Sequence, residues 1–215
     1  MDMEWIKVGP VKVGLIAHDD RIVAHIREKK KPFEPKSLAA WADMCVKGKT
    51  ALDIGGYSGL FAIAAAKLGC KVWCFEPMPL NLNRIRMNAI QNNVKFEIVA
   101  GVVSETVGKL DLTYNDKVRG LTAGASLVRK KGYKMPVASV TVDAMHLDDV
   151  CAIKIDVERG EPAVLRGAMA TIDLCNPKLI VEALGEDERA AVQHEIPRYR
   201  VESVMDVRNL LMSPA

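Results

Sequence analysis

The chain has 215 residues, of which 49% are apolar and 27% are charged, a balance typical of a soluble globular domain rather than a disordered one. No apolar stretch approaches the ~20 residues that a membrane-spanning helix needs, and the first ten residues carry acids without an apolar core, unlike a secretory signal. The net charge of +3 is too small to indicate nucleic-acid binding by itself. We therefore expect a single cytoplasmic domain without membrane association.

We expect residues 1–36 to form an N-terminal segment of short strands, called the lead-in below, with strands at 11–16 and 21–26. We expect the main domain to span residues 37–215 and to begin with a helix over 38–45. The following strands are expected at 51–54, 71–75, 96–103, 137–142, 151–157 and 178–184, with helices at 60–68, 81–92, 163–174 and 187–194. A closing pair of strands is expected at 199–205 and 209–212, and an irregular segment contains Gly120, Gly124 and Gly132. Strands that alternate with helices indicate an α/β fold with a doubly wound, mostly parallel sheet.

Two short runs, at 27–31 and 129–131, are strongly basic. Such runs usually mark solvent-exposed surface, and steering of an anionic substrate is the alternative. The five cysteines form no CxxC pair and have no neighbouring histidine, so we interpret them as reduced, structural thiols and expect no zinc site.

The strongest signal for a binding site is the segment LDIGGYSG at 52–59, which lies between a predicted strand and a predicted helix. Glycines allow the backbone to approach a ligand closely. Ligands of open α/β sheets bind where the strands end. Asp53, just before the glycines, is placed to orient the turn and the charged amino acid end of a ligand.

A second acid, Glu76, ends the next predicted strand and lies 21 residues after Gly55. An ionised carboxylate is acceptor-only, so it can accept hydrogen bonds from both hydroxyls of a ribose. The turn and the acid together indicate a cofactor that contains a nucleoside. A tight turn without any ligand is the simpler alternative.

Two cofactors fit this outline, a dinucleotide and S-adenosylmethionine (SAM). A dinucleotide site requires the spacing G-x-G-x-x-G, whereas the glycines here stand at 55, 56 and 59. SAM has no pyrophosphate and carries an ammonium group, which suits an acid two positions before the first glycine. SAM is therefore the favoured cofactor.

Three stretches resemble the FkbM-type branch of the class I SAM-dependent methyltransferases. They are ALDIGGYSGLFAIAAAKLG from residue 51, FEPMPLNLNRIRMN from residue 75 and IKIDVERGEPAVLRGA from residue 153. Their order and spacing also agree with the family, so the resemblance covers residues 33–184. It implies a Rossmann-like, seven-stranded class I methyltransferase fold with an antiparallel last strand, and methyl transfer to a hydroxyl of a small molecule or glycan.

The resemblance also implies a set of cofactor-binding residues, with Val102 beside the adenine. The candidates are Asp53, Gly55, Gly56, Tyr57, Ser58, Gly59, Glu76, Pro77 and Val102. By the same likeness, Phe33 and Glu34 lie over the cofactor or simply pack in a loop.

Two positions depart from the family pattern. Tyr57 stands where asparagine is common, and Arg159 replaces the glycine after D-V-E. We expect Gly160 to supply the missing flexibility. Arg159 also places a cation near the acceptor site, so the family's usual substrate does not follow automatically.

Carboxylates gather after the strand at 151–157, at the edge where the SAM methyl group is expected. Asp156 is our first candidate for a general base or acceptor-orienting group and Glu158 is the second, while Glu182 is a weaker candidate. Interaction with the dipole of the helix that starts near Pro162 is the alternative role. A metal held by these carboxylates is conceivable, but the spacing does not require one.

The same region bears on the substrate. DNA amino-methyltransferases carry an Asp/Asn-Pro-Pro-aromatic run where this chain has residues 156–159, and no Pro-Cys nucleophile is present. Aromatic residues make up only 5% of the chain, which argues against a base-stacking surface and hence against nucleic acid. A nucleic-acid methyltransferase and a SAM- or nucleoside-binding protein without catalysis remain the alternatives.

Overall fold

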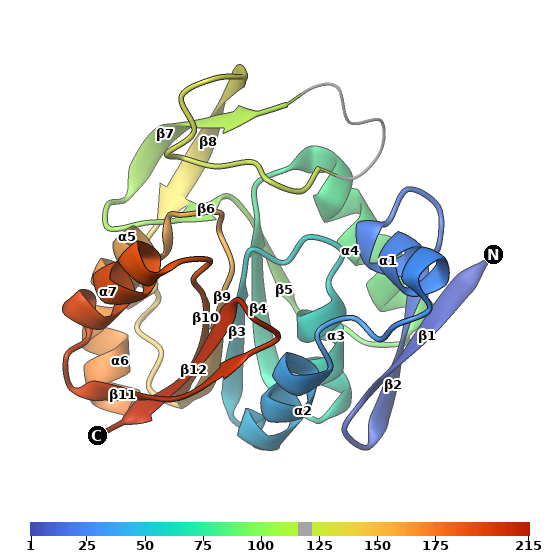
Figure 1. Cartoon of the computed structure of the whole chain (residues 1–215), viewed down its shortest axis with the longest axis horizontal. Coiled ribbons are helices and arrows are strands. Elements are labelled where there is room, and N and C mark those ends of the chain that lie inside the picture. The colour runs from blue at the N-terminus through green and yellow to red at the C-terminus, as the bar shows by residue number, and fades with distance from the viewer. Residues whose placement is uncertain (116–121) are drawn as a thin grey trace.

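The computed structural model describes residues 1–115 and 122–215, and both ranges contain helices and strands (Figure 1). In chain order the elements are β1 (Met3–Val8), β2 (Val11–Ile16), α1 (Arg21–Lys29), α2 (Pro35–Met44), β3 (Thr50–Ile54), α3 (Leu60–Lys67), β4 (Lys71–Glu76), α4 (Pro79–Gln91), β5 (Glu97–Ala100), β6 (Val102–Val103), β7 (Gly108–Tyr114), β8 (Tyr133–Val140), a 3-10 turn (Asp143–Met145), β9 (Val150–Ile155), α5 (Glu161–Arg166), α6 (Met169–Cys175), β10 (Lys178–Glu182), α7 (Glu186–Glu195), β11 (Tyr199–Met205) and β12 (Asn209–Pro214). Among the described residues, no helix is both long and apolar enough to cross a bilayer.

Seven strands form the central sheet, in the order β11-β12-β10-β9-β3-β4-β5. The five strands from β10 to β5 are parallel to one another. The last strand of the chain, β12, runs antiparallel to both of its neighbours. The predicted doubly wound sheet with an antiparallel last strand is confirmed.

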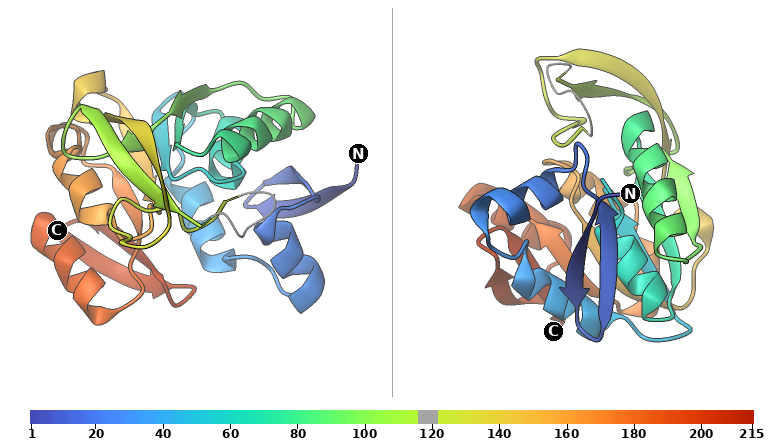
Figure 2. Two further views of the ribbon diagram at one scale, coloured as in Figure 1. Left: turned by 90° about the horizontal axis from the view of Figure 1, so that it is seen from above. Right: turned by 90° about the vertical axis from the view of Figure 1, so that its right-hand side faces the viewer.

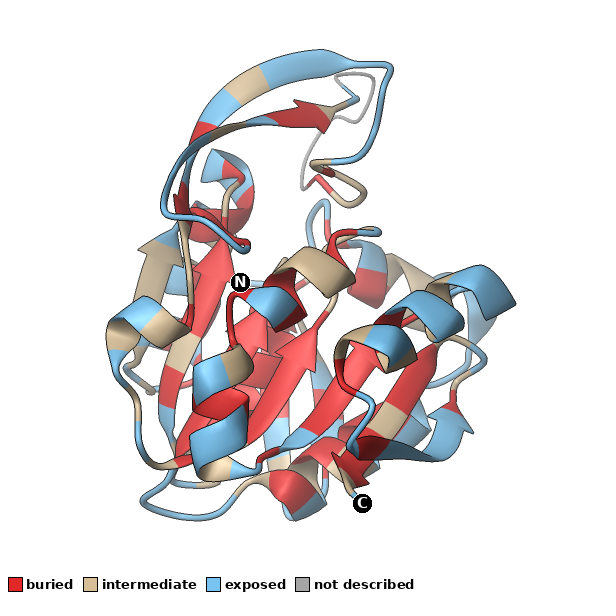
Figure 3. Cartoon of the chain, turned by 90° about the vertical axis from the view of Figure 1, so that its left-hand side faces the viewer, coloured by how far each residue is buried: buried red, intermediate tan, exposed pale blue. Residues whose placement is uncertain are grey.

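Side chains alternate across the sheet, so each face is covered by its own helices. On β3, Ala51 belongs to a core shared with α2, α3 and the β1–β2 hairpin. The next residue, Leu52, belongs to a second core on the opposite face, shared with α5, α6 and α7. Because both faces are covered, the central strands are buried along most of their length (Figure 3).

The lead-in contains a hairpin and a helix rather than only strands. The β1–β2 hairpin docks through two asparagines of the α4 region: Asn92 Oδ1 accepts the Gly14 N–H at 2.9 Å and Asn88 Oδ1 accepts the Ile16 N–H at 3.0 Å. The prediction of a strand at 21–26 is wrong, since this segment is α1. Asp20 caps that helix, because its Oδ1 accepts the backbone N–H groups of residues 22 and 23.

Two further predictions need correction at glycines. The strand expected at 96–103 divides into β5 and β6 at Gly101, where a Cβ would approach Ala138 O to 2.7 Å. The helix expected at 163–174 divides into α5 and α6 at Gly167, where a Cβ would collide with the carbonyl group of Ser104. In both places a second chain segment crosses close to the glycine backbone.

The segment expected to be irregular contains a β-hairpin. Strands β7 and β8 pair antiparallel from Gly108↔Ser139 to Tyr114↔Tyr133, and β6 completes a small three-stranded sheet. Gly120 lies outside the described residues. The hairpin arches above the carboxyl ends of the central parallel strands (Figures 1 and 2). It therefore stands over the edge of the sheet where the sequence predicts a site.

Candidate active site

A cavity of about 520 Å³ lies at the carboxyl ends of β3, β4 and β9. Its floor is formed by the glycine turn after β3 and by the end of β4. Its walls come from the loop after β9, from α1 with Phe33 and Glu34, and from the segment 122–127 of the hairpin loop. The volume is within the usual range of small-molecule sites, ≈ 300–1,000 Å³. The cavity therefore lies where the sequence predicts a cofactor, and its size suits a small molecule.

The glycine turn is shaped by close packing against its neighbours. Gly55 has φ +91°, and a Cβ at this position would overlap the backbone carbonyl of Asp156. The N–H groups of Gly55 and Gly56 both donate to Phe75 O at 3.0 Å. Only glycine at position 55 allows β3, β4 and β9 to end so close together around the cavity.

Tyr57 connects the turn to the lead-in helix. Its φ of +51° is left-handed, a conformation that asparagine adopts more readily than tyrosine, which explains the family preference noted above. Its N–H donates to Glu76 Oε2 at 2.9 Å, and its hydroxyl accepts the Arg21 N–H at 2.9 Å. Burial raises the pKa of Tyr57 to about 12, so its phenol stays neutral. Tyr57 therefore fixes α1 against the cavity.

Glu76 lines the cavity and is only 4% exposed. Its Oε1 accepts the Met78 N–H at 2.8 Å and its Oε2 accepts the Tyr57 N–H at 2.9 Å. Each oxygen has a second lone pair, so the carboxylate can accept further hydrogen bonds from a pair of hydroxyls. Burial raises the pKa of Glu76 to about 7, against the opposing effect of the two backbone donors.

Asp53 is almost completely buried and also lines the cavity. Its Oδ2 accepts the Ala62 N–H at 2.9 Å, which ties the turn to α3. Its Oδ1 has no hydrogen-bond partner among the described residues. Burial raises the pKa of Asp53 to about 6, while the charge of Lys154 acts to lower it. A buried carboxylate oxygen without a partner suits a ligand that brings its own donor or cation.

Lys154 is a site residue that the sequence interpretation missed. It lies on β9, is 3% exposed, and its Nζ donates to Asp156 Oδ2 at 2.8 Å. The same ammonium lies 4.7 Å from the centre of the Phe61 ring. Burial acts to lower the pKa of Lys154, but the charges of Asp156, Asp53 and Glu34 outweigh it and raise the pKa. A lysine inside an apolar strand was the available signal, because buried charges are normally paired.

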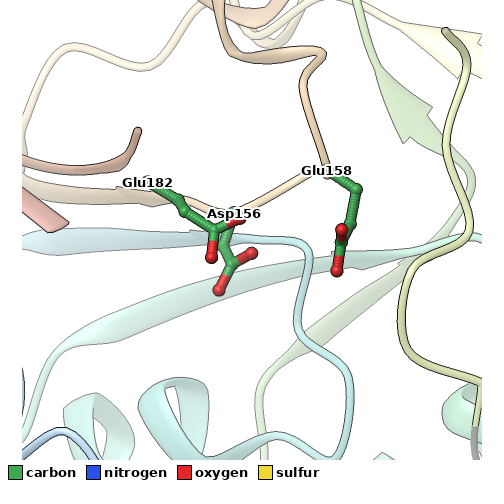
Figure 4. Close-up of side chains that lie close together, drawn as sticks. All are labelled: Asp156, Glu158 and Glu182. Carbon is green, nitrogen blue, oxygen red and sulfur yellow. The ribbon is translucent and has the colours of Figure 1, made fainter. Parts of the chain in front are cut away.

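Three carboxylates meet at the ends of β9 and β10 (Figure 4). One oxygen each of Asp156, Glu158 and Glu182 lies within 4.8 Å of the others. Arg208 pairs with Glu182. Burial acts to raise the pKa of Asp156, but Lys154 and then Arg208 lower it, whereas burial and Asp156 raise the pKa of Glu182 to about 8. Two of the three carboxylates thus have cationic side chains as partners.

Glu158 lies on a strained loop that contacts the hairpin. Glu158 and Arg159 have φ of +58° and +78°, whereas the N-cap Gly160 has φ −96°. The expectation that Gly160 supplies the missing flexibility is wrong, because Arg159 itself adopts the left-handed conformation that the family's glycine favours. Ser126 Oγ of the hairpin loop donates to Glu158 O at 2.6 Å. Burial and then Asp156 raise the pKa of the Glu158 carboxyl.

The cavity brings together most of the predicted site residues. The candidates that line it are Asp53, Gly55, Gly56, Tyr57, Glu76, Pro77, Val102, Asp156 and Glu158. Ser58 and Gly59 lie outside the lining: the Ser58 carbonyl accepts the Asn88 side-chain N–H at 2.8 Å, and Gly59 is the N-cap of α3. Besides Lys154, the sequence interpretation missed Arg21, His25 and Arg208, whose positions depend on contacts far apart in the chain.

The comparisons with known proteins give the family and the fold of the chain. The family model of the methyltransferase FkbM domain matches residues 53–211. A comparison with curated protein sequences finds no match. A solved structure of methyltransferase FkbM from Methylobacillus flagellatus is similar, with a TM-score of 0.54 and 17% identity over 78% of this chain; the chain spans 44% of that protein's length.

Two other solved structures show the same fold at lower identity. A 16S rRNA methyltransferase from T. thermophilus, solved with AdoMet and guanosine, has a TM-score of 0.56 and 9% identity, with coverage of 99% of this chain and 50% of that one. A precorrin-6y C5,15-methyltransferase from Geobacter metallireducens has a TM-score of 0.53 and 11% identity, with coverage of 84% and 88%. The fold is thus that of the class I methyltransferases, and the chain belongs to the FkbM methyltransferase family.

Proposed function

We propose that the protein is an enzyme that transfers a methyl group from SAM to a hydroxyl of a small molecule or glycan. The family supports methyl transfer. The observation that carries the choice of SAM is the pair of buried acids, Asp53 and Glu76, that face one cavity. Glu76 has lone pairs for two hydroxyls, and Asp53 has an oxygen without a partner.

In this proposal, Glu76 accepts hydrogen bonds from the ribose hydroxyls, Val102 borders the adenine, and Asp53 meets the ammonium of the amino acid end. Gly55, Gly56 and Tyr57 form the floor between them, and Pro77 continues it. SAM supplies a methyl group that is already activated, because its carrier leaves as a neutral thioether. The protein must then position the acceptor, for which orientation can contribute up to ≈ 7–11 kcal/mol.

The electrostatics assign different roles to the two catalytic candidates. Lys154 keeps the pKa of Asp156 low, so Asp156 stays ionised and suits the role of a hydrogen-bond acceptor that orients the hydroxyl. Burial raises the pKa of Glu158, which makes it the stronger base of the two. We therefore propose that Glu158 accepts the hydroxyl proton, an effect worth ~10²–10⁴-fold in rate.

The metal considered for these carboxylates is not part of the proposal. Lys154 and Arg208 already provide positive charge to Asp156 and Glu182. The two alternatives to the proposed activity are methylation of a nucleic acid and binding of SAM without catalysis.

One experiment separates these possibilities. The purified chain is titrated with SAM by calorimetry and then incubated with methyl-labelled SAM and three sets of acceptors: sugars and other small hydroxyl compounds, the same compounds with the hydroxyl blocked, and RNA or DNA. We expect SAM binding and label transfer that depends on the free hydroxyl. Label in nucleic acid alone would replace the proposed acceptor, and binding without transfer to any acceptor would support the non-catalytic alternative.

A further inference from the structure

The positive charge of the chain is concentrated in the hairpin above the cavity. Its described residues, 108–115 and 122–140, contain five lysines and arginines but only one aspartate, a local charge of +4. Since the whole chain has a net charge of +3, all other residues together carry −1. The described basic residues of the hairpin are exposed. A field of this kind over a cavity mouth favours the approach of an anion.

Two arginines, one on α1 and one after the hairpin loop, add positive charge near the cavity. Arg21 begins α1 and lines the cavity. Arg129 follows the hairpin loop, and its Nη2 lies only 3.2 Å from the position that a Cβ on Gly124 would take, beside the cavity lining. Both guanidinium groups act electrostatically on Glu158. The charges of Arg21 and Arg129 therefore reach the Glu158 carboxylate, which we propose as the base for the acceptor.

Neither guanidinium has a carboxylate within 4 Å in the part of the chain that the structure describes. Arg27, Arg159, Arg166, Arg198 and Arg208 all have carboxylate partners within 4 Å. Six described arginines form no ion pair with residues 1–115 or 122–215: Arg21, Arg84, Arg86, Arg129, Arg189 and Arg200. Of these six, Arg21 and Arg129 are the two whose charge acts on Glu158 beside the cavity. Two such arginines near one cavity suit an anionic partner.

We propose that Arg21 and Arg129 form a subsite that binds a phosphate ester on the acceptor, next to the hydroxyl that is methylated. This inference rests on the proposed function and names its substrate class. The guanidinium fork matches phosphate oxygens in a bidentate manner. A phosphate dianion can satisfy both arginines together, whereas a single carboxylate carries only one charge. Arg159 does not belong to the subsite, because it pairs with Glu188 at 3.2 Å.

The test uses pyrophosphate as the probe, titrated by calorimetry into the full chain saturated with S-adenosylhomocysteine. Arg21→Gln and Arg129→Gln are compared with Lys95→Gln and Lys178→Gln, which remove the same charge from exposed positions outside the cavity lining. The Arg21→Gln variant keeps the bond to Tyr57, because that bond uses the backbone N–H. Each arginine variant should bind pyrophosphate about tenfold more weakly or worse, while the lysine variants change little.

Methyl transfer to sugar phosphates and to the matching free sugars forms the second arm. We expect the phosphate to lower the KM of the wild-type protein at least tenfold, and the arginine variants to lose this preference. No pyrophosphate binding, or equal loss in the lysine controls, would overturn the subsite. The protein could instead bind a single-stranded oligonucleotide tightly, with a steep salt dependence, and pyrophosphate only weakly. That result would overturn the subsite and show that the surface binds a nucleic-acid backbone.

Failure of the subsite is distinguishable from failure of the proposed function. SAM affinity is measured for every variant in the same buffer. If the wild-type protein does not bind SAM, the proposed function fails. If all variants bind SAM within about twofold of wild type but the arginine changes leave pyrophosphate affinity intact, the phosphate subsite alone is wrong.

Discussion

Lys154 and Asp156, two residues apart at the end of β9, form an ion pair between a buried lysine and a half-buried aspartate, with 2.8 Å between Nζ and Oδ2. The lysine also faces the charges of Asp53 and Glu34. Together with Arg208, Lys154 thus balances the negative charge of the carboxylates around the cavity. This pair lies between Asp53, on the proposed cofactor side of the site, and Glu158, on the proposed acceptor side.

Replacing Lys154 by methionine should destabilise the protein by about 1–3 kcal/mol, because it leaves the half-buried Asp156 carboxylate without its charged partner. The free energy of unfolding is measured by urea denaturation. The double variant Lys154→Met/Asp156→Asn should recover part of the loss, since the orphaned charge is also removed. If the Lys154→Met variant is as stable as wild type, the ion pair makes no net contribution to the free energy of unfolding.

Replacing Glu158 by glutamine should lower the kcat of methyl transfer by ~10²–10⁴-fold, because the amide cannot accept the hydroxyl proton. SAM affinity should remain within about twofold of wild type. Asp156→Asn should also retain SAM binding but turn over slowly, because the acceptor is less well oriented. Undiminished kcat in Glu158→Gln would remove this residue from the mechanism, and the same result in Asp156→Asn would remove Asp156.

The stability of the ligand-free protein should fall as the pH rises from about 5 to 8. Burial raises the pKa of Glu76 and of Glu161 to about 7 and that of Asp53 to about 6. In the unfolded chain, the same groups release their protons near pH 4–4.5. Between pH 5 and 8 the native state therefore binds more protons than the unfolded state, so the free energy of unfolding falls as the pH rises. The lowered pKa of Asp156 acts only below this window.

This pH dependence is measured as the Tm of wild type and of Glu76→Gln from pH 5 to 8. The variant should show a shallower decline, because one of the buried carboxyl groups no longer titrates. A Tm that increases over the same range, or an identical slope in Glu76→Gln, would contradict the raised pKa values.

Replacing Arg159 by glycine should stabilise the protein by about 0.5–1 kcal/mol. The left-handed conformation costs a residue with a Cβ ~1–2 kcal/mol, and the greater chain entropy of glycine offsets part of the gain. The lost ion pair with Glu188 is solvent-exposed on the arginine side and is worth little. Glu188→Gln serves as the control for that pair. A destabilised Arg159→Gly variant would mean that the strain at this position is small.

The sequence predicts the parts of the fold that short segments determine. The glycine turn, the acid at the end of β4 and the apolar run of β9 each lie within one local pattern, and the structure has them where they are expected. The error at α1 is also local: the β-branched residues Ile22 and Val23 suggested a strand, while the capping Asp20 was the signal for a helix.

The missed features depend on contacts between distant segments. Strand β7 pairs with β8 across a long loop, so its alternating pattern was not recognised without its partner. Arg208 reaches the site only because β12 is inserted beside β10. Likewise, Arg21 lines the cavity and Arg129 lies beside the lining residue Gly124, although the two arginines are more than a hundred residues apart in the sequence.

The most direct test of the proposed cofactor site is a crystal structure of the protein with S-adenosylhomocysteine. We predict that the two ribose hydroxyls lie within hydrogen-bond distance of the Glu76 carboxylate and that the ammonium lies on the side of Asp53. An adenosyl group bound elsewhere, or a cavity closed by side chains in the presence of saturating ligand, would contradict the account.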